Sequence, residues 1–383
     1  MISKRNLFIN LTISIFSCLI GLCIVNAFLL FSGQAYYPRA LNQLQPDILR
    51  TFSPDTYGSD LRRYTAILGD SFAEGIGDAY LRGEYDYSIA HHLHRNDDKN
   101  YLIFGRSGFG SISAVSNLIK IYKASRYING IENLAKPEQI VFCFYGGNDL
   151  DNNIDEYELT GRPGESVEEY VTRRITENTT FSVRNRIEAT MPATKFLHTV
   201  FKRSVDAGMR KYRAIRNSQE LNSDAPRTGN NSMSSPVPIS GIEPLQSASM
   251  ELSEEEVSFA LQVFMESVRE LQTWAPEARI TIVYLPSIVS PYQWQDPVQI
   301  HQTFPERGVS ETTLEANNAR SEMLRGRIGT FAVQHAMEFV DTAPTIAEVA
   351  QKQALHGPDD WRHFNDDGYR VIADLIAATG IAN

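Results

Sequence analysis

The side chains best suited to chemistry lie in four short segments of the chain, and the first is Gly69-Asp70-Ser71. It directly follows the apolar run 64–68, so the Ser71 hydroxyl would lie at the carboxyl end of a strand, where open α/β sheets bind ligands. A serine there could act as a nucleophile once a neighbouring base takes its proton. The same tripeptide also often turns the chain or caps a helix. By itself the segment leaves both roles open.

A glycine-rich turn forms the second segment. Residues 104–110 read Phe-Gly-Arg-Ser-Gly-Phe-Gly and directly follow an apolar run at residues 101–104. Glycine permits backbone conformations that aim an amide N–H into a cleft. Such a turn could also hold a phosphate, but its spacing matches neither the P-loop nor the dinucleotide fingerprint. We therefore expect a backbone hydrogen-bond donor here rather than a nucleotide site.

The third and fourth segments supply an amide, a carboxylate and an imidazole. Residues 145–149 read Tyr-Gly-Gly-Asn-Asp, in which the Asn148 side chain could donate to negative charge that develops on an oxygen, or simply form a turn. In residues 360–363, Asp360 precedes His363 by three positions. The carboxylate could therefore accept a hydrogen bond from Nδ1 of His363 and fix the tautomer that a general base requires. Together with a serine, these groups could catalyse attack on an ester carbonyl.

Parallel strands would bring these segments together. Five short apolar or β-branched runs are separated mostly by helical patterns, and they lie at residues 64–68, 101–104, 139–145, 279–285 and 338–341. Strands that alternate with helices predict a parallel sheet, whose carboxyl edge would collect the segments that follow its strands. The clearest helix has Ser253 as its N-cap and ends near Pro276, and a final helix is expected near residues 368–378.

The four segments follow the order of the Ser, Gly, Asn and His blocks of the SGNH or GDSL hydrolase superfamily, and the chain resembles that family from about residue 64 to its C-terminus. The resemblance implies a flavodoxin-like three-layer α/β/α fold with a five-stranded parallel sheet. It also implies that Ser71 is the nucleophile, His363 the base and Asp360 the residue that orients the histidine. The oxyanion hole would use the backbone N–H groups of Ser71 and Gly108 and the side-chain amide of Asn148.

Two further acids, Asp70 and Asp149, belong to the same blocks. The resemblance implies that they brace their loops rather than take part in the chemistry. The glycine of the second block could also be Gly105 or Gly110, because three glycines lie in that turn.

A histidine cluster offers a second kind of chemistry. His91 and His94, which flank His92, would share one helical face at a spacing that a metal could use. No cysteine or further histidine lies nearby, and the three cysteines of the chain give neither a disulfide framework nor a zinc spacing. The mechanism that the resemblance implies needs no metal and no cofactor, so we expect neither.

The N-terminal residues 7–31 contain no charged side chain, and 25 residues at about 1.5 Å each can cross a hydrocarbon core of roughly 30 Å. This pattern predicts a transmembrane helix. The alternative is a cleaved signal peptide, with Gly33 and Ala35 near a possible cut, although its apolar region is normally shorter. Lys4 and Arg5 precede the run, so the positive-inside rule predicts a single-pass protein with a cytoplasmic N-terminus and a periplasmic or extracellular catalytic domain.

The expected organisation is an N-terminal anchor at residues 1–33, a linker at 34–62 and a hydrolase domain at 63–383. Predicted strands and helices no longer alternate at about 151–250, and we interpret this range as an insertion. Within it, residues 217–250 are rich in Ser, Asn, Pro and Gly and are expected to be disordered.

Charge and aromatic residues give three hypotheses about partners. Residues 173–216 contain eleven Lys or Arg against three acids, and this basic amphipathic helix could contact an anionic lipid or polymer, or simply cover the core. The net charge of the whole chain is −10, which argues against nucleic acid. Tyr292 and Trp294, after the fourth predicted strand, could stack on a sugar ring or pack in the core.

Three functions fit these observations. We favour an extracytoplasmic serine esterase that cleaves acyl esters of a glycan or a lipid through an acyl-serine intermediate. The first alternative is an O-acyltransferase that modifies a cell-surface polysaccharide and needs a separate multi-span partner to deliver its acyl donor. The second is a glycan-binding scaffold without activity, against which the intact Ser71, Asn148, Asp360 and His363 argue.

Overall fold

The computed structural model describes residues 17, 20–21, 51–53, 55–58, 60–84, 86–127, 131, 133–180, 230–236, 238–301 and 309–381. The chain divides into two compact units. One unit comprises residues 51–123, 133–180 and 226–383, and it contains the central sheet. The other comprises residues 1–50, 124–132 and 181–225, of which few are described.

Several predictions made from the sequence concern residues that the structure does not describe. The predicted anchor at 7–31 lies outside the described residues apart from three positions, and so does the part of the linker at 34–50. Residues 181–216 of the predicted basic helix lie outside them as well. Within the described ranges, no helix is both long and apolar enough to cross a membrane. The anchor and the basic helix stay predictions.

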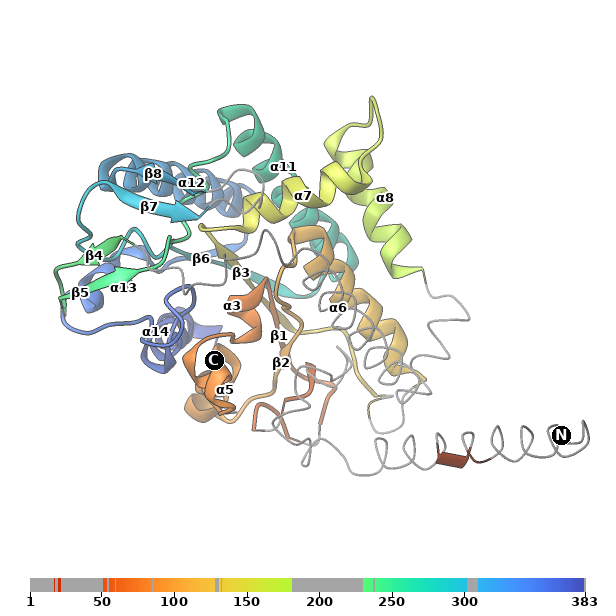
Figure 1. Cartoon of the computed structure of the whole chain (residues 1–383). Coiled ribbons are helices and arrows are strands. Elements are labelled where there is room, and N and C mark those ends of the chain that lie inside the picture. The colour runs from red at the N-terminus through yellow and green to blue at the C-terminus, as the bar shows by residue number, and fades with distance from the viewer. Residues whose placement is uncertain are drawn as a thin grey trace, which may run out of the picture. The chain divides into compact units, whose positions relative to one another are not determined.

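A five-stranded parallel sheet forms the centre of the fold (Figure 1). Its strands lie in the order β2, β1, β3, β6, β9, and each neighbouring pair is parallel. The strands are β1 (Thr65–Leu68), β2 (Tyr101–Ile103), β3 (Gln139–Tyr145), β6 (Arg279–Leu285) and β9 (Glu338–Asp341). They read as nearly continuous apolar runs because strands covered on both faces bury both sets of side chains. The predicted sheet is confirmed.

Helices connect these strands and follow the last one. They are α3 (Ser71–Glu74), α4 (Asp78–Arg82), α5 (Ile89–Asp97), α6 (Ser111–Ser125), α7 (Asp149–Thr160), α8 (Val167–Thr179), α11 (Glu254–Trp274), α12 (Leu314–Gln334), α13 (Ala343–Ala350) and α14 (Asp366–Ile376). The helix predicted from Ser253 is α11. Its capping box is present, since Ser253 Oγ accepts the amide of Glu256 and the Glu256 carboxylate accepts the amide of Ser253.

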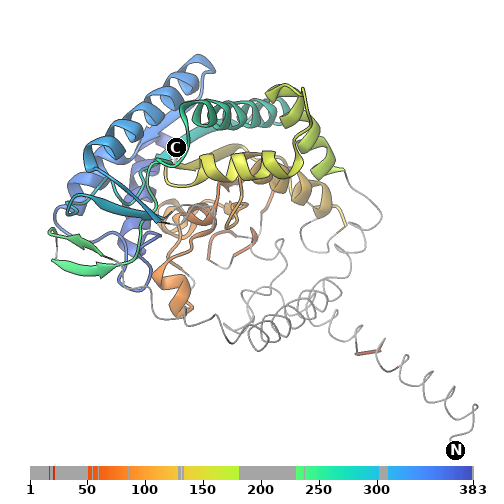
Figure 2. The ribbon, with the colours of Figure 1, turned by 45° about the horizontal axis from the view of Figure 1, so that its top comes forward.

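Alternating side chains along β3 show that both faces of the sheet are covered. Phe142 and Phe144 contact the ring of Phe264 in α11 on one face. Cys143 and Tyr145 belong to the core on the other face, together with apolar residues of α5, α13 and α14. Figure 2 shows the teal α11 and the blue α12 together along one side of the sheet. The chain therefore has the three-layer α/β/α fold that we expected.

The region predicted as an insertion is more regular than expected. Its first part forms α7 and α8, and its last described part forms the antiparallel pair β4 (Asn231–Met233) and β5 (Ile239–Ile242). A second antiparallel pair, β7 (Val298–His301) and β8 (Val309–Thr312), lies between β6 and α12 in the sequence.

The prediction of disorder at 217–250 needs correction. Residues 217–229 and 237 lie outside the described residues, but 230–236 and 238–250 are ordered, and Met233, Ile242 and Leu245 are buried. The stabilising contacts come from elsewhere in the sequence, because the Asn231 side chain bonds the amide and carbonyl of Gln299 at 2.7 and 2.8 Å. Composition alone could not reveal such partners.

Candidate active site

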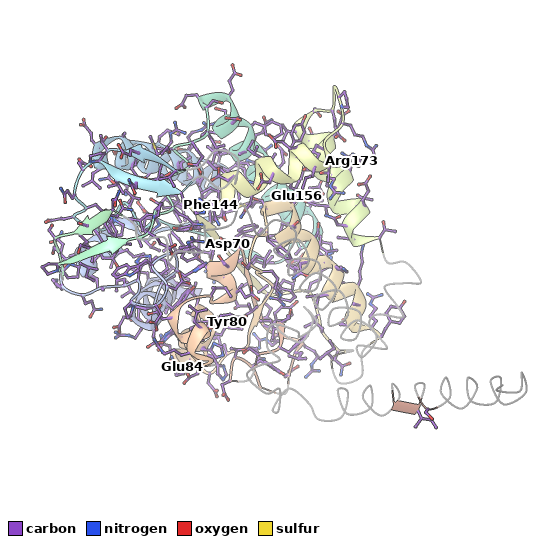
Figure 3. The ribbon with its side chains drawn as sticks, in the orientation of Figure 1. Asp70, Tyr80, Glu84, Phe144, Glu156 and Arg173 are labelled. Atoms are coloured by element: carbon purple, nitrogen blue, oxygen red, sulfur yellow. The ribbon has the colours of Figure 1, made fainter. Side chains whose placement is uncertain are left out.

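Ser71 is the first residue of α3, just beyond the carboxyl end of β1. The chain turns between them at Gly69, whose φ is +138° and at which a Cβ atom would lie 2.6 Å from the carbonyl oxygen of Cys143. Asp70, labelled beside α3 in Figure 3, caps the helix by accepting the amide of Phe72 at 2.9 Å. The cap and the candidate nucleophile are therefore different residues of the same turn.

Three of the predicted residues are joined by hydrogen bonds. Ser71 Oγ lies 2.9 Å from Nε2 of His363, and Nδ1 of the same ring lies 2.7 Å from Oδ2 of Asp360. The other carboxylate oxygen of Asp360 accepts the amide of Arg362 at 2.9 Å. With Nδ1–H donating to Asp360, Nε2 of the neutral ring accepts from the Ser71 hydroxyl. General-base activation of a serine requires this arrangement.

The neighbours of Asp360 favour its ionised form. Burial raises the pKa of this carboxyl, but the hydrogen bond and charge of His363 and the Arg362 amide outweigh it, so the pKa lies below its usual value. The side chains of His363 and Asp360 are 16% and 13% exposed, and Ser71 is 3% exposed. Because little water competes for the Nδ1–H group, the hydrogen bond to Asp360 holds His363 in one tautomer.

Among the three glycines of the second segment, Gly108 has the most open surroundings. Its φ is +76°, and a Cβ atom there would meet nothing within 4 Å. At Gly105 a Cβ would lie 2.5 Å from Cβ of Ala73, and at Gly110 it would lie 2.8 Å from Oδ1 of Asn153. Close packing thus explains Gly105 and Gly110, whereas Gly108 is free to present its backbone to a ligand.

The Asn148 turn lies directly beyond β3. Asp149 closes this turn, because its Oδ2 accepts the amide of Tyr145 at 2.9 Å. Burial, followed by the charge of Asp70, raises the pKa of Asp149 well above its usual value. The hydrogen bond to Tyr145 shows that this carboxyl braces the turn. Since β3 pairs with β1, the turn lies at the same edge of the sheet as Ser71.

The predicted blocks therefore meet at one edge of the sheet. Hydrogen bonds join Ser71, His363 and Asp360, and β2 and β3 bring the turns of the other two blocks to that edge. A model of the GDSL-like lipase/acylhydrolase family matches residues 67–371, which contain all four blocks. The chain belongs to this family. It is a hydrolase that acts on ester bonds.

Other comparisons add little to this assignment. The acylhydrolase also aligns with the crystal structure of phospholipase A1 from Streptomyces albidoflavus NA297, at 15% sequence identity and a TM-score of 0.38. That alignment covers 83% of this chain and 99% of the other chain. No curated protein matches the sequence.

His356 is a buried histidine beside the site that none of the four sequence segments indicates. Its Nδ1 lies 2.9 Å from the hydroxyl of Tyr292, which also accepts the amide of Leu355 at 2.8 Å. Burial, with the nearby charge of His363, lowers the pKa of His356 to about 3, so the ring stays neutral. In this acylhydrolase, Tyr292 thus holds the segment that leads to His363. Tyr292 and Leu355 are 63 positions apart in the sequence, so no local pattern connects them.

The hypothesis that Tyr292 and Trp294 stack on a sugar is not supported. Both are buried, at 4% and 5% exposure, and their rings contact each other edge to face. The indole Nε1 donates to the carbonyl of Ile288 at 3.2 Å. They are core residues of the acylhydrolase.

The histidines that suggested a metal have separate partners. His91 Nδ1 lies 2.7 Å from Oγ of Ser88, and His92 Nε2 lies 3.0 Å from Oδ1 of Asp366. His94 Nδ1 donates to the carbonyl of Lys99 at 2.6 Å. Their ring nitrogens hold three different segments rather than converge on one point.

Proposed function

We propose that this acylhydrolase is a serine esterase that cleaves carboxylic acyl esters through an acyl-serine intermediate. The observation that supports this mechanism most directly is the continuous hydrogen-bond path from Asp360 through His363 to Ser71, with distances of 2.7 and 2.9 Å. Each proton transfer that a serine mechanism needs can occur along this path without movement of a backbone segment.

In the first half of the reaction, Nε2 of His363 takes the Ser71 proton as Oγ attacks the ester carbonyl carbon. The carbonyl oxygen becomes an oxyanion, which the N–H groups of Ser71 and Gly108 and the amide of Asn148 would stabilise. The tetrahedral intermediate then collapses, the bond to the alcohol oxygen breaks, and His363 gives that oxygen its proton. The acyl group remains on Ser71, and the alcohol leaves.

The second half repeats these steps with water. His363 takes a proton from water, the hydroxide attacks the acyl carbonyl, and the bond to Ser71 Oγ breaks as the serine regains a proton from His363. Asp360 stays ionised throughout and stabilises the imidazolium that forms in each half.

We place the substrate outside the cytoplasm and expect it to be an acyl ester of a glycan or a lipid. The support comes from the sequence, in which Lys4 and Arg5 precede the uncharged residues 7–31. Reporter fusions at the C-terminus would test this orientation: alkaline phosphatase should be active and green fluorescent protein dark. The reverse pattern would contradict an extracytoplasmic domain.

Activity is tested with the purified full chain on p-nitrophenyl acetate, butyrate and palmitate, on an O-acetylated polysaccharide and on phosphatidylcholine vesicles. Ser71→Ala should abolish hydrolysis. Ser107→Ala is the matched control, since it removes an exposed hydroxyl at the same sheet edge and should leave the rate unchanged. The preferred ester then identifies the glycan or lipid class. A wild-type rate no higher than that of Ser71→Ala, with every ester, would refute the proposal.

A further inference from the structure

Asp78 is a buried acid beside the active site that the mechanism above does not use. It is the first residue of α4, seven residues after Ser71, and only 1% of it is exposed. Its nearest cation is Arg82, whose guanidinium lies 3.8 Å away and also lies 3.5 Å from Asp359. A carboxylate is rarely buried without strong partners, because desolvation of the charge is costly.

The partners of Asp78 are two backbone amides from the other end of the chain. Oδ1 accepts the amide of Asp360 at 2.5 Å, and Oδ2 accepts the amide of Asp359 at 3.2 Å. The carbonyl of Asp360 in turn accepts the amide of Gly357 at 3.1 Å. The backbone of Asp360 is therefore held on both sides, and its carboxylate is aimed at His363.

The chain around Asp78 is packed tightly against the same loop. A Cβ atom at Gly77 would lie 2.3 Å from the carbonyl oxygen of Phe364, so only glycine allows this approach. The hydroxyl of Tyr369 donates to the carbonyl of Ile76. Figure 3 labels Tyr80 on α4, which follows α3 and the nucleophile in the chain. Residues 76–78 thus join the Ser71 segment to the His363 segment.

We propose that Asp78 is the positioning residue that fixes Asp360, and through it His363, relative to Ser71. Each of the two N–H groups points at its own oxygen of Asp78, and a carboxylate supplies two acceptor oxygens where an amide or hydroxyl side chain supplies one. The path of hydrogen bonds then runs from Asp78 to the Asp360 amide, and from the Asp360 carboxylate to His363 and Ser71. This role rests on the proposed serine mechanism.

The first test compares Asp78→Asn with Asp359→Asn in the full chain. The amide side chain of the first variant is isosteric with the carboxylate but turns an N–H₂ group toward one backbone amide. Asp359 has a side chain that is 58% exposed, and its substitution removes the charge of a neighbouring acid that lies near the same Arg82 guanidinium. We expect Asp78→Asn to lower kcat by about 10- to 100-fold with KM within about threefold, because small misplacements of catalytic groups are costly. Asp359→Asn should stay within about twofold of wild type.

The pH profile separates positioning from simple loss of folded enzyme. A misaligned Asp360 stabilises the imidazolium of His363 less, so the acid limb of kcat/KM should move to lower pH in Asp78→Asn. Fewer folded molecules would lower the rate equally at every pH. An Asp78→Asn enzyme with the kcat and the pH profile of Asp359→Asn would overturn the proposal.

A spectroscopic readout does not depend on any substrate. The Nδ1 proton of His363 should give a downfield resonance, assigned by its loss in His363→Gln, that shifts or disappears in Asp78→Asn but not in Asp359→Asn. If the wild type hydrolyses no ester, the proposed function fails while this resonance still decides the role of Asp78. If Asp78→Asn does not fold, hydrogen exchange of the wild-type protein tests the role of Asp78 instead. Protected amides at Asp359 and Asp360 support the proposal, and freely exchanging amides refute it.

Discussion

The loop at residues 355–364 and the contact between α7 and residues 247–251 both bury carboxyl groups, but they surround those groups with opposite partners. In the loop, each oxygen of Asp360 accepts a hydrogen bond, from His363 Nδ1 or from the amide of Arg362. The backbone of Asp360 is held in addition by Asp78. N–H donors therefore favour the charged form of this acid.

The other contact places acid against acid. Asp151, in the first turn of α7, is fully buried, and the carboxyl of Glu251 lies beside it. The hydroxyl of Ser249 donates to Asp151 at 3.1 Å, and Ser247 donates to Glu251 at 3.2 Å. Burial, followed by the charge of Glu251, raises the pKa of Asp151 well above its usual value. The neutral form of this acid is therefore favoured.

The difference shows that a buried carboxyl group can take part in catalysis in one place and only in packing in another. An ionised carboxylate with fixed N–H donors keeps its position and charge across the neutral pH range. A carboxyl whose pKa is raised by burial and by a second acid holds two segments together best while a proton is bound to it. Substitutions in the loop should therefore change the rate, and substitutions at the α7 contact should change the stability.

The largest effect is expected from Asp360→Asn, which removes the ionised carboxylate of the 355–364 loop. An amide in place of the carboxylate would favour the wrong His363 tautomer, so kcat/KM should fall on the order of 10³- to 10⁴-fold. Ester hydrolysis measures the rate, and a thermal melt shows that the fold is retained. Retention of more than about a tenth of the activity would mean that Asp360 does not orient His363.

The next effect is expected at Asn148, which lies between the site and α7. Asn148→Ala removes an amide donor from the expected oxyanion hole, and kcat should fall about 10²- to 10³-fold while KM changes little. Asn148→Asp has the same size but carries acceptors only, so it should lose at least as much. Steady-state kinetics on one ester separates kcat from KM. A loss confined to KM would instead assign Asn148 to substrate binding.

The third prediction concerns the α7 contact. Because the folded pKa of Asp151 is raised, the folded state binds more protons than the unfolded chain above the unfolded value of about 3.9. The stabilisation that the bound proton gives is present at low pH. It is lost as the pH rises from the unfolded pKa of Asp151 to its raised pKa in the folded state. Asp151→Asn can accept from Ser249 and donate to Glu251, so it should raise the free energy of unfolding at pH 7 by about 1 to 3 kcal/mol.

Denaturant unfolding at pH 5 and pH 7 checks this sign. The gain from Asp151→Asn should be larger at pH 7, and ester hydrolysis should match wild type at both values. A variant less stable than wild type at pH 7 would show that the two acids do not repel each other there.

The smallest effect is expected at an ion pair that joins the 355–364 loop to Glu243, which precedes residues 247–251 in the sequence. Arg362, next to His363, forms an ion pair with Glu243 at 3.2 Å, and their side chains are 37% and 39% exposed. Exposed pairs of this kind contribute at most about 1 kcal/mol, so Glu243→Gln should lower stability by less than that. The rate should stay within about fivefold, since a tenfold change corresponds to about 1.4 kcal/mol. A larger loss of kcat would show that the pair orients the catalytic loop.

Much of the fold and most of the candidate site could be predicted from the sequence because their signals are local. Each buried strand is a short apolar run, and the turns that follow β1, β2 and β3 carry their own Gly, Asp or Asn within a few residues. Ser253 and Glu256 form a capping box that is visible three positions apart. Residues 230–250 escaped prediction because their apolar residues are few, and their packing partners lie in β7 and near Trp294.

The parallel sheet, the four blocks and the pairing of Asp360 with His363 could be predicted from the sequence alone, since each depends on residues close together along the chain. Tertiary structure alone decided which glycine of the second block faces open space, because that depends on Ala73 and Asn153 at the other two positions. It also decided that Asp78 holds the amide of Asp360, a contact that spans 282 positions. Hydrogen bonds between segments so far apart form only when packing brings the segments together, and no local pattern records which ones will meet.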